Sequence, residues 1–394
     1  MTQTLDARVI VVGGGPAGLA AATLMALEGV DTMLVAPEAG PDPRTVALME
    51  PSLRLLGHLG AWPGSLSFVS SPLLHLDIID DMGNLVSAPR LTFSAVELGL
   101  DAFGWNIPLG ALIVELRAAA LAAGVRMVPD TVTTSENLGA VAAIETTGGQ
   151  RFYGEVLIAA DGIESLLRKS AGISVDRWSF DQSALVTTFS HSGSHRDVST
   201  ERHRPGGAFT TVPLPGNASS LVWMGAPNII ESLLFRTGQE LAMEIQIATR
   251  GTLGLISNVA PPKAFPMRGL RARSFAANRT MLTGETAHAF PPVGAQGLNM
   301  SLRDVGHAVD VVLGHDDAGS PAAMADYHAR RSRDVTERQA IISAMNTSML
   351  AEFLPLDLMR VGALSAISSF PPLRQLVMRQ GLAPTNNLPY AMRG

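Results

Sequence analysis

The sequence predicts an α/β fold in which a Rossmann-like domain is interleaved with an antiparallel-sheet domain and followed by a helical C-terminal region. Three observations support this prediction. The chain begins with a strand, a glycine-rich turn, a helix and a second strand. Alternating strand-like segments then occur in two separate places, and helical spacing of apolar residues fills the last ~75 residues.

Composition sets the broad class of protein. The 394 residues are 46% hydrophobic and 16% charged, a balance that can bury the core of two joined domains. A net charge of −6 without blocks of like charge argues against nucleic acid as a partner. The absence of cysteine excludes disulfides, thiolate metal sites and cysteine nucleophiles. No signal peptide and no apolar run of ~18 residues is present, so we expect a cytoplasmic protein, with a peripheral position at the inner membrane surface left open.

The first half of the chain yields most of the expected elements. Its opening strand, helix and strand form a βαβ unit, and a hinge at Asp81–Asn84 predicts an early antiparallel hairpin. The expected strands are Arg8–Val12, Asp31–Ala36, Leu74–Ile79, Leu85–Leu91, Val125–Val128 and Glu155–Ala160, and the expected helices are Pro16–Leu27 and Leu112–Ala123.

The second half returns to strands before it becomes helical. Ala184–Trp223 alternates as antiparallel strands do, with a polar loop predicted from Ser190 to Gly207. A short buried strand is expected at Thr280–Leu282, with a long helix from about Gly297. Apolar residues then recur at fourfold spacing, namely Ile341, Met345, Met349 and Phe353, with Ile342 and Leu350 alongside.

The first chemical motif is the turn Gly13-Gly14-Gly15-Pro16-Ala17-Gly18 between the first strand and the first helix. Gly13 permits the tight turn, Gly15 lets the backbone approach a pyrophosphate, and Gly18 lets the helix pack on the strand. The amino end of the helix adds free N–H groups and a positive dipole end. Three such glycines are common in a chain with 38 glycines, so the flanking strand and helix carry the prediction of a bound dinucleotide.

One part of the dinucleotide pattern is missing. An acidic residue normally ends the second strand and holds the ribose hydroxyls, but Ala36 stands there. Glu38 follows two residues later, beyond a proline. Either Glu38 reaches back to the ribose, or other groups hold it.

Two further glycine-bearing motifs follow the first. In one, an apolar strand stops at Asp161-Gly162 and a short helix with Arg168 follows. In the other, Thr280–Leu282 leads to Gly284-Glu285, His288 and a Pro/Gly loop that opens a helix. Motifs of zinc proteases, P-loop NTPases and α/β-hydrolases are absent from the sequence.

These three motifs, in this order, resemble the aromatic hydroxylases of the para-hydroxybenzoate hydroxylase fold. Over nearly its whole length the chain is similar to the ubiquinone-biosynthesis FAD-dependent hydroxylase family. Arg44–Leu48 followed by Leu56–Trp62 matches a stretch after the second strand, and Pro292–Asn299 with Leu302-Arg303-Asp304 matches the flavin loop of that family.

The resemblance implies FAD as the cofactor and assigns its contacts. The glycines of the first motif would take the pyrophosphate, Arg44 a phosphate or the ribityl chain, and Asp161-Gly162 would lie behind the flavin. Glu285 stands where most relatives have aspartate, and Leu109 stands where a polar FAD contact is expected. The implied cofactor-binding residues are Gly13, Gly15, Pro16, Ala17, Gly18, Arg44, Asp161, Gly162, Gly284, Glu285, Pro292, Gly294, Ala295, Gln296, Gly297, Leu298 and Asn299.

The domain division follows from the same resemblance. Residues 1–73, 107–180 and 276–320 are assigned to the FAD-binding domain, residues 74–106 and 181–275 to the substrate domain, and residues 321–394 to the helical region. The two domains are interleaved and not consecutive.

The implied activity is FAD-dependent monooxygenation. The enzyme would hydroxylate the ring of a polyprenylated phenol in ubiquinone biosynthesis through a flavin hydroperoxide, with O₂ as oxidant and NAD(P)H as a transient electron donor. The helix near Gly297 would supply a positive electrostatic site, and the sheet between Ala184 and Trp223 would position the substrate. A hydroxylase of another aromatic or secondary metabolite is an alternative. A non-catalytic flavin-fold scaffold subunit is another alternative. The departures from the expected FAD contacts at Ala36, Leu109 and Glu285 favour it.

Several side chains allow two readings. His288 is a weak candidate for a catalytic base and a better one for orienting the flavin loop. His191, His195 and His203 fit a solvated loop better than a metal site, so no metal is expected. The three arginines that follow Tyr327, namely Arg330, Arg331 and Arg333, fit a solvated helix face better than a pyrophosphate site. The late apolar helices fit a core, with contact to a membrane surface or a biosynthetic complex as the alternative.

Overall fold

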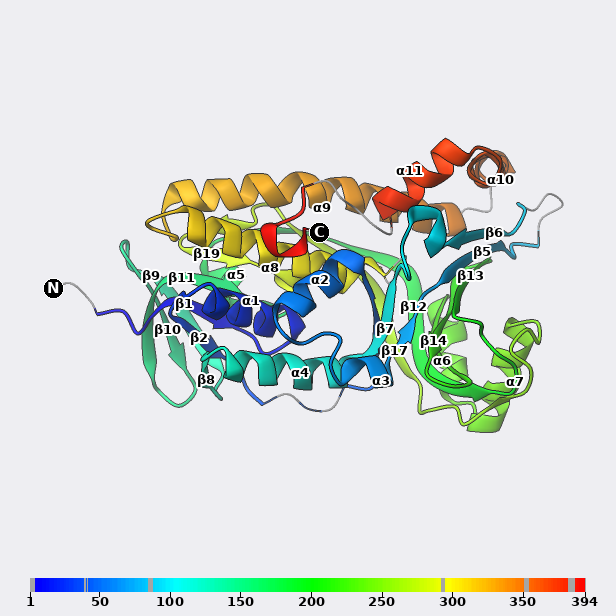
Figure 1. Cartoon of the computed structure of the whole chain (residues 1–394), viewed down its shortest axis with the longest axis horizontal. Coiled ribbons are helices and arrows are strands. Elements are labelled where there is room, and N and C mark those ends of the chain that lie inside the picture. The colour runs from blue at the N-terminus through cyan, green and yellow to red at the C-terminus, as the bar shows by residue number, and fades with distance from the viewer. Residues whose placement is uncertain are drawn as a thin grey trace.

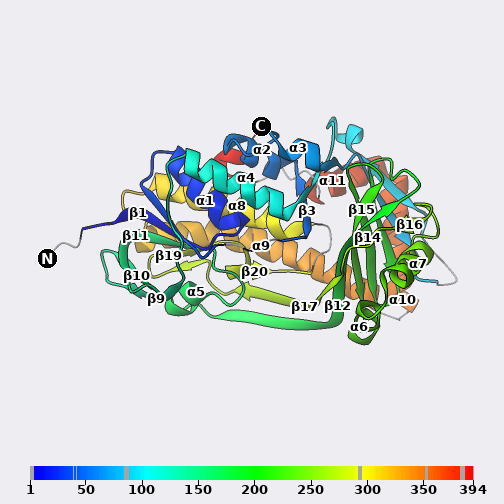
Figure 2. The same ribbon diagram turned by 90° about the horizontal axis from the view of Figure 1, so that it is seen from below.

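Two β-sheets at opposite ends of the molecule organise the chain, as Figure 1 shows. The computed structural model describes residues 4–38, 40, 42–83, 88–291, 295–350, 354–381 and 387–393. One lobe holds a largely parallel sheet with its helices, and the other holds an antiparallel sheet. Long strands run between the lobes, as the view from below shows (Figure 2).

The opening βαβ unit is present as predicted. β1 pairs in parallel with β2 on one side and with β11 on the other, so the strand order crosses over at β1. Five of the six residues of β1 are apolar and buried, and all four residues of β2 are buried, three of them apolar, because helices cover both faces of this sheet. The strands of the first sheet are β1 (Ala7–Val12), β2 (Thr32–Val35), β8 (Arg126–Val128), β9 (Val132–Asn137), β10 (Ala142–Thr146), β11 (Arg151–Ala159), β18 (Ala276–Ala277) and β19 (Thr280–Leu282).

Helix α1 is buried on all sides. It packs against two further helices, α4 and α8, as well as against the sheet, so its apolar residues form no single stripe. The helices of this lobe are α1 (Pro16–Leu27), α2 (Glu50–His58), α3 (Leu66–Val69), α4 (Leu109–Ala122), α5 (Leu166–Ser170), α8 (Gln296–Gly314) and the 3-10 turn η2 (Gly284–Thr286).

The second sheet is mixed but mostly antiparallel. One of its faces carries Leu185, Phe209 and Leu221, and two helices, α6 and α7, cover this face. Its strands are β5 (His75–Asp80), β6 (Leu91–Ser94), β12 (Val175–His191), β13 (Val198–Arg204), β14 (Gly207–Leu214), β15 (Ala218–Gly225), β16 (Ile256–Ser257), β17 (Lys263–Ala272) and β20 (His288–Ala289), and its helices are η1 (Ala95–Leu98), α6 (Pro227–Leu234) and α7 (Gly238–Ala248).

A small third sheet joins the two lobes. It consists of β3 (Thr45–Met49), β4 (Ser71–Pro72) and β7 (Gly104–Pro108). The buried Asn106 of β7 donates its side-chain amide to the carbonyl of Pro213, 2.8 Å away, and to Ser220 Oγ, 3.2 Å away. These bonds fix the second sheet against the FAD-binding lobe.

The loop predicted from Ser190 to Gly207 is wrong for most of its length. β12 extends to His191, and Val198–Arg204 forms β13, which pairs in parallel with β5 and antiparallel with β14. The polar residues of β13 find partners inside the sheet, since Arg202 pairs with Asp81 and His203 with Glu201. A polar composition therefore did not mean solvent exposure.

The early hairpin is confirmed with a shorter second strand. β5 pairs antiparallel with β6, which begins at Leu91. The predicted strand Leu85–Leu91 is wrong over residues 88–90, which are not in a strand, while residues 84–87 lie outside the described residues.

The C-terminal region is helical, as predicted. α9 (Pro321–Leu350) runs along the first lobe and reaches β14 of the second sheet (Figure 1). α10 (Leu354–Ser369), α11 (Pro371–Gly381) and the 3-10 turn η3 (Tyr390–Met392) follow. The fourfold spacing from Ile341 to Leu350 falls on α9, and Phe353 lies outside the described residues. Within the described ranges, no helix has the length and apolarity needed to cross a bilayer.

The six-segment domain division stays a prediction. The parallel sheet draws its strands from residues 7–35, 126–159 and 276–282, while the second sheet draws most of its strands from residues 75–94 and 175–272. The chain thus passes between the two lobes several times.

Candidate functional site

The amino end of α1 is open toward the carboxyl edge of the parallel sheet. Gly13 has a φ of +121°, and a Cβ there would overlap the carbonyl oxygen of Ala160. A Cβ at Gly18 would overlap the carbonyl oxygen of Gly13. A Cβ at Gly15 would meet nothing within 4 Å, and no side chain caps the helix. Gly13 and Gly18 therefore close the turn, while Gly15 leaves space for a ligand over free N–H groups.

The amino end of α8 has the same character. Ala295 precedes the helix with a φ of +54°, no side chain caps it, and a Cβ at Gly297 would meet nothing within 4 Å. Asn299 anchors this end: its Oδ1 accepts from Met49 N at 2.9 Å, and its Nδ2 donates to Ala47 O at 2.9 Å. Leu298 packs partly buried against the core. Two predicted contacts, Pro292 and Gly294, lie outside the described residues.

The two helix ends meet at the η2 turn. Gly284 has a φ of +65°, and a Cβ there would lie 3.5 Å from Ala17 Cβ on α1 and 3.2 Å from Ser301 Oγ on α8. Its neighbour Glu285 is exposed. The first and third glycine motifs are therefore brought to one place, with the carboxylate of Glu285 beside them.

Arg44 lies where this site meets the second sheet. Its guanidinium forms a bidentate pair with Asp42, with Nη2 to Oδ2 at 2.6 Å and Nε to Oδ1 at 2.9 Å. The hydrogen bond to Asp42 raises the pKa of Arg44, and the negative charge of Glu285 adds to this effect. The guanidinium carbon also lies 6.0 Å from the ring centroid of Phe265 on β17. Arg44 thus connects the η2 turn to the edge of the second sheet.

The second glycine motif builds a turn behind Gly13. Asp161 accepts hydrogen bonds from Ser165 Oγ at 2.6 Å and from Leu166 N at 2.7 Å, and Gly162 has a φ of +84°. The carboxylate of Asp161 therefore caps α5. The buried Arg168 donates to Thr286 O at 2.9 Å, which ties this motif to the η2 turn.

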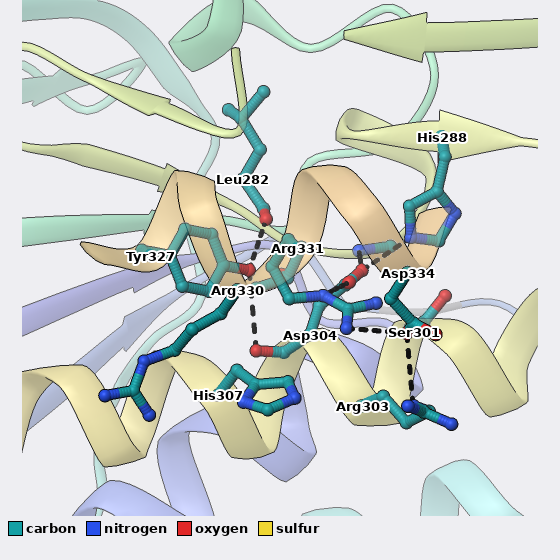
Figure 3. Close-up of polar contacts among 12 residues, drawn as sticks. Leu282, His288, Ser301, Arg303, Asp304, His307, Tyr327, Arg330, Arg331 and Asp334 are labelled. Carbon is teal, nitrogen blue, oxygen red and sulfur yellow. Dashed lines mark hydrogen bonds and ion pairs between the residues drawn. The ribbon is translucent and has the colours of Figure 1, made fainter. Parts of the chain in front are cut away.

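The side chain of His288 is buried and contacts both Asp304 and Phe290. Its side chain is 1% exposed, its Nε2 lies 2.7 Å from Asp304 Oδ2, and its ring stacks on Phe290 at 5.2 Å. Asp304 also accepts from Gly284 N at 2.9 Å (Figure 3). This geometry favours the reading of His288 as an orienting residue of the flavin loop.

A cluster of buried charges lies beneath the flavin loop, and sequence reasoning missed it. Arg331 has no exposed side-chain surface and donates from Nε to Asp304 Oδ1 at 2.6 Å and from Nη1 to Asp334 Oδ2 at 2.8 Å, as Figure 3 shows. Burial alone would raise the pKa of Asp304, but His288 and Arg331 hold it below its usual value. Tyr327 joins from one turn earlier, donating to Leu282 O at 2.7 Å.

The prediction that Arg331 lies on a solvated helix face is therefore wrong. Arg333 is exposed and Arg330 is partly exposed, but Arg331 shares the buried face of α9 with Tyr327. The spacing of four residues between Tyr327 and Arg331 was the available signal, because residues four apart share one face of a helix.

The middle of the second-sheet face turned toward the first lobe carries uncharged residues, with Lys263 of β17 beside Val186 and Glu201 of β13 beside Thr210 at its flanks. Residues directly opposed in an antiparallel pair share a face, and the register aligns Val186 with Val222 and Val222 with Thr210. The next row aligns Thr188 and Val212 with Ser220, which receives the bond from Asn106. We call the half-buried residues of these two rows the uncharged wall; they are Val186, Thr188, Thr210, Val212 and Val222.

Apolar packing continues from the wall toward the flavin loop. Ala184, Ala208, Met224 and Met267 form a buried cluster against which Phe290 packs. Phe290 follows His288 and Ala289 of β20, which pairs with the far end of β17. Phe290, two residues before the predicted flavin loop, thus packs against the second sheet.

The two departures from the expected pattern lie close to the site. Ala36 follows β2, and a Cβ at Gly14 would lie 3.0 Å from its Cβ; Glu38 is exposed. Leu109 starts α4 and donates its N–H to Arg44 O at 2.8 Å, so it supports the arginine through its backbone.

The expectation that His191, His195 and His203 lie in a solvated loop is wrong for His191, which ends β12, and for His203 in β13, since both are buried. His191 Nε2 bonds to Ser219 Oγ at 3.0 Å, and His195 Nε2 to Gly216 O at 2.9 Å. Among the residues that the structure describes, no group of three or more His, Asp or Glu side chains could hold a metal ion.

A cavity of about 410 Å³ lies elsewhere, between β9, β18 and the start of α9. Arg279 in its lining is committed to Asp317, Gly139 O and Glu155 O. The cavity is near the start of β19, at the opposite edge of the sheet from the glycine turn, and it offers no free cation to a phosphate.

Comparison with known proteins gives a consistent result. Residues 6–72 and 110–339 match the family described as FAD binding domain. The chain is 29% identical to the ubiquinone hydroxylase UbiL of Rhodospirillum rubrum (95% of this chain, 89% of that protein) and 26% identical to the 3-demethoxyubiquinol 3-hydroxylase of Escherichia coli (95% and 98%). It is 30% identical to the protoasukamycin 4-monooxygenase of Streptomyces nodosus subsp. asukaensis (85% and 86%).

Solved structures show the same fold. The p-nitrophenol 4-monooxygenase PnpA of Pseudomonas putida DLL-E4 superposes with a TM-score of 0.78 over 98% of this chain and 100% of that chain, at 18% identity. The predicted α/β architecture with an antiparallel-sheet domain is thereby confirmed.

Proposed function

Since the chain belongs to the FAD binding domain family, we propose that it hydroxylates the aromatic ring of a polyprenylated phenol in ubiquinone biosynthesis as an FAD-dependent monooxygenase. The family match and the named relatives show that the chain is an FAD-dependent aromatic monooxygenase. The substrate is our proposal. The meeting of two uncapped helix ends, α1 and α8, at Gly284 supports the FAD site. The row of uncharged residues on the adjacent sheet face supports the substrate.

The described residues fit FAD. The open amino end of α1 at Gly15 suits a pyrophosphate, because free N–H groups and the helix dipole favour negative charge there. Arg44 and Glu285 lie together beside this end and suit the phosphate and ribityl hydroxyls between it and α8. When bound, FAD supplies the transfer of electrons from a nicotinamide to O₂, and NAD(P)H is the donor typical of this family.

The chain contributes charge and shielding to this chemistry. The amino end of α8 presents N–H groups from Gln296 and Gly297, which stabilise negative charge on the cofactor. Phe290 and the apolar cluster around Met224 and Met267 exclude water from the side of the second sheet. His288 lies too deep to exchange a proton with a substrate, so we assign it the orientation of the loop.

The uncharged wall supports a neutral, apolar substrate. Val186, Val222 and Thr210 carry no charge themselves, and the charged residues beside them in the register are one cation, Lys263, and one anion, Glu201. A phenol with an apolar tail loses little solvation against such a surface, whereas a carboxylate would lose much more. Two of the relatives compared here are named for ubiquinone or ubiquinol hydroxylation, which agrees with this preference.

A second candidate has its own support. The relative named protoasukamycin 4-monooxygenase is 30% identical, slightly more than the ubiquinone hydroxylase from Rhodospirillum rubrum. A hydroxylase of a secondary metabolite therefore stays the alternative, as does a non-catalytic scaffold.

Deletion of the gene and mass spectrometry of the quinone pool separate these candidates. The proposal predicts an accumulated, under-hydroxylated prenylphenol that the wild-type gene clears. Complementation with Gly15→Ala, for which we expect FAD affinity to fall at least tenfold, should clear the intermediate less well than the wild-type gene. Full rescue by a variant shown to lack FAD would establish the scaffold, and an unchanged quinone pool would reject the quinone pathway.

We also propose peripheral contact with a membrane or a biosynthetic complex. Phe370, directly before α11, is 59% exposed, and Leu376, within α11, is 50% exposed. Such exposed apolar side chains suit an apolar partner. Flotation with vesicles of bacterial lipids tests this proposal. Binding that Phe370→Ser abolishes supports the membrane, and absence of binding by the wild-type protein rejects it.

A further inference from the structure

Helix α9 reaches both sides of the predicted flavin loop. Arg338 Nη1 donates to Oε1 of Gln296, the first residue of α8, at 2.9 Å. About two turns earlier on α9, Arg331 donates to one oxygen of Asp304. The other oxygen of Asp304 accepts a hydrogen bond from Gly284 N. Helix α9 thus holds residues that lie 42 and 27 positions earlier in the chain.

The arginines of this face share one carboxylate. Asp334 accepts from Arg331 Nη1 at 2.8 Å and from Arg338 Nε at 3.1 Å, and its Oδ2 lies 3.2 Å from Arg303 Nε. Together with Asp304, this makes three arginines and two aspartates among the described residues, so the cations outnumber the carboxylates by one in this part of the cluster. All five side chains are at most 14% exposed.

The protonation behaviour of the cluster agrees with an excess of positive charge. Burial, together with the nearby cations Arg338 and Arg331, lowers the pKa of Arg303 to about 10 against the pull of Asp334. Burial would raise the pKa of Asp334, but the three arginines hold it far below its usual value. Since the cluster is shielded from water, its charge acts over a longer range than a surface charge does.

We propose that Arg338 is a positioning residue for the flavin: through Gln296 it fixes the first turn of α8, and it places the net positive charge of the buried cluster behind that helix end. Reduction adds negative charge to FAD, so this arrangement binds reduced FAD more tightly than oxidised FAD and raises the midpoint potential of the cofactor. The inference rests on FAD occupying the cleft and not on the identity of the substrate.

The test compares two arginines of the same helix. Arg333 is 86% exposed and pairs with Glu337, so Arg333→Gln removes an equal charge from α9 without touching α8. The full chain loaded with FAD is measured for its midpoint potential and for its FAD dissociation constant. For Arg338→Gln we expect the preference for reduced over oxidised FAD to fall on the order of tenfold, about 30 mV for a two-electron couple. Arg333→Gln should match the wild type.

Conservative variants separate positioning from stability. Arg338→Lys keeps the charge and should retain most of the potential, while Gln296→Leu keeps the charge but breaks the contact and should mainly weaken FAD binding. Equal potentials in Arg338→Gln, Arg333→Gln and the wild type overturn the proposal, even if the melting temperature of Arg338→Gln falls. If Arg338→Gln does not accumulate, unchanged FAD affinity in Gln296→Leu overturns it. A protein that binds FAD but fails the quinone test leaves this inference standing and rejects only the substrate.

Discussion

Removing the charge of Asp304 should destabilise the protein strongly, because Arg331 would lose one of its two carboxylate partners while buried from solvent. Both side chains have no exposed surface, and their closest atoms are 2.6 Å apart. Breaking a buried pair by removing one partner costs roughly 3–5 kcal/mol. Asp334 still faces Arg331 in the variant, so we expect Asp304→Asn to lower the free energy of unfolding by about 3 kcal/mol, at the lower end of that range.

Equilibrium urea unfolding, followed by tryptophan fluorescence, measures this change. Asp326→Asn is the matched control, because Asp326 pairs with Arg330 at 2.8 Å on the partly exposed side of α9. It should cost no more than about 0.5 kcal/mol. In the double variant with Arg331→Met, the cost of Asp304→Asn should shrink by about 2 kcal/mol, since no buried arginine then loses a carboxylate partner. Additive costs, or an Asp304→Asn no worse than Asp326→Asn, would refute the reasoning.

Three further predictions follow from the same structure. Gly15→Ala should lower FAD affinity at least tenfold and leave the melting temperature of the FAD-free protein unchanged, whereas Gly18→Ala should lower both, because only the Cβ at position 18 would overlap the chain. Titration of FAD fluorescence and thermal melts measure these two quantities. A destabilised FAD-free Gly15→Ala variant would contradict the prediction. Burial and the nearby Arg331 lower the pKa of His307 to about 4. The neutral ring therefore contributes about 3 kcal/mol to the free energy of unfolding above pH ~6.5, and this contribution is lost as the pH falls toward 4. His307→Gln should flatten the stability profile in that window, and an unchanged profile argues against a neutral buried ring. Val222→Asp, on the uncharged wall, should raise KM or lower kcat at least tenfold with FAD affinity unchanged, whereas Val114→Asp on the exposed side of α4 should do neither.

Local patterns in the sequence were sufficient for the FAD-binding lobe. Residues Pro16–Leu27 form α1 with the predicted bounds, because the glycine turn and the proline at the first helical position define its start. The strands on both sides of it were within one residue of the structure. These elements are specified by residues close together in the chain.

Elements that depend on distant partners could not be predicted in the same way. β13 is polar, and it forms a strand because β5, more than 100 residues earlier, pairs with it and Asp81 neutralises Arg202. Arg331 is buried because Asp304 and Asp334 surround it, and the local sequence shows only a run of arginines. The described parts of the first and third glycine motifs lie close together at Gly284, but the charges that support them from α9 required the fold.

A crystal structure of the protein with FAD tests the central claim most directly. We expect the pyrophosphate over Gly15 and the isoalloxazine ring against the first turn of α8, with the uncharged wall facing the ring across the substrate space. Density for FAD in another part of the molecule, such as the cavity beside Arg279, or a ring held away from Gln296 and Gly297, would contradict it.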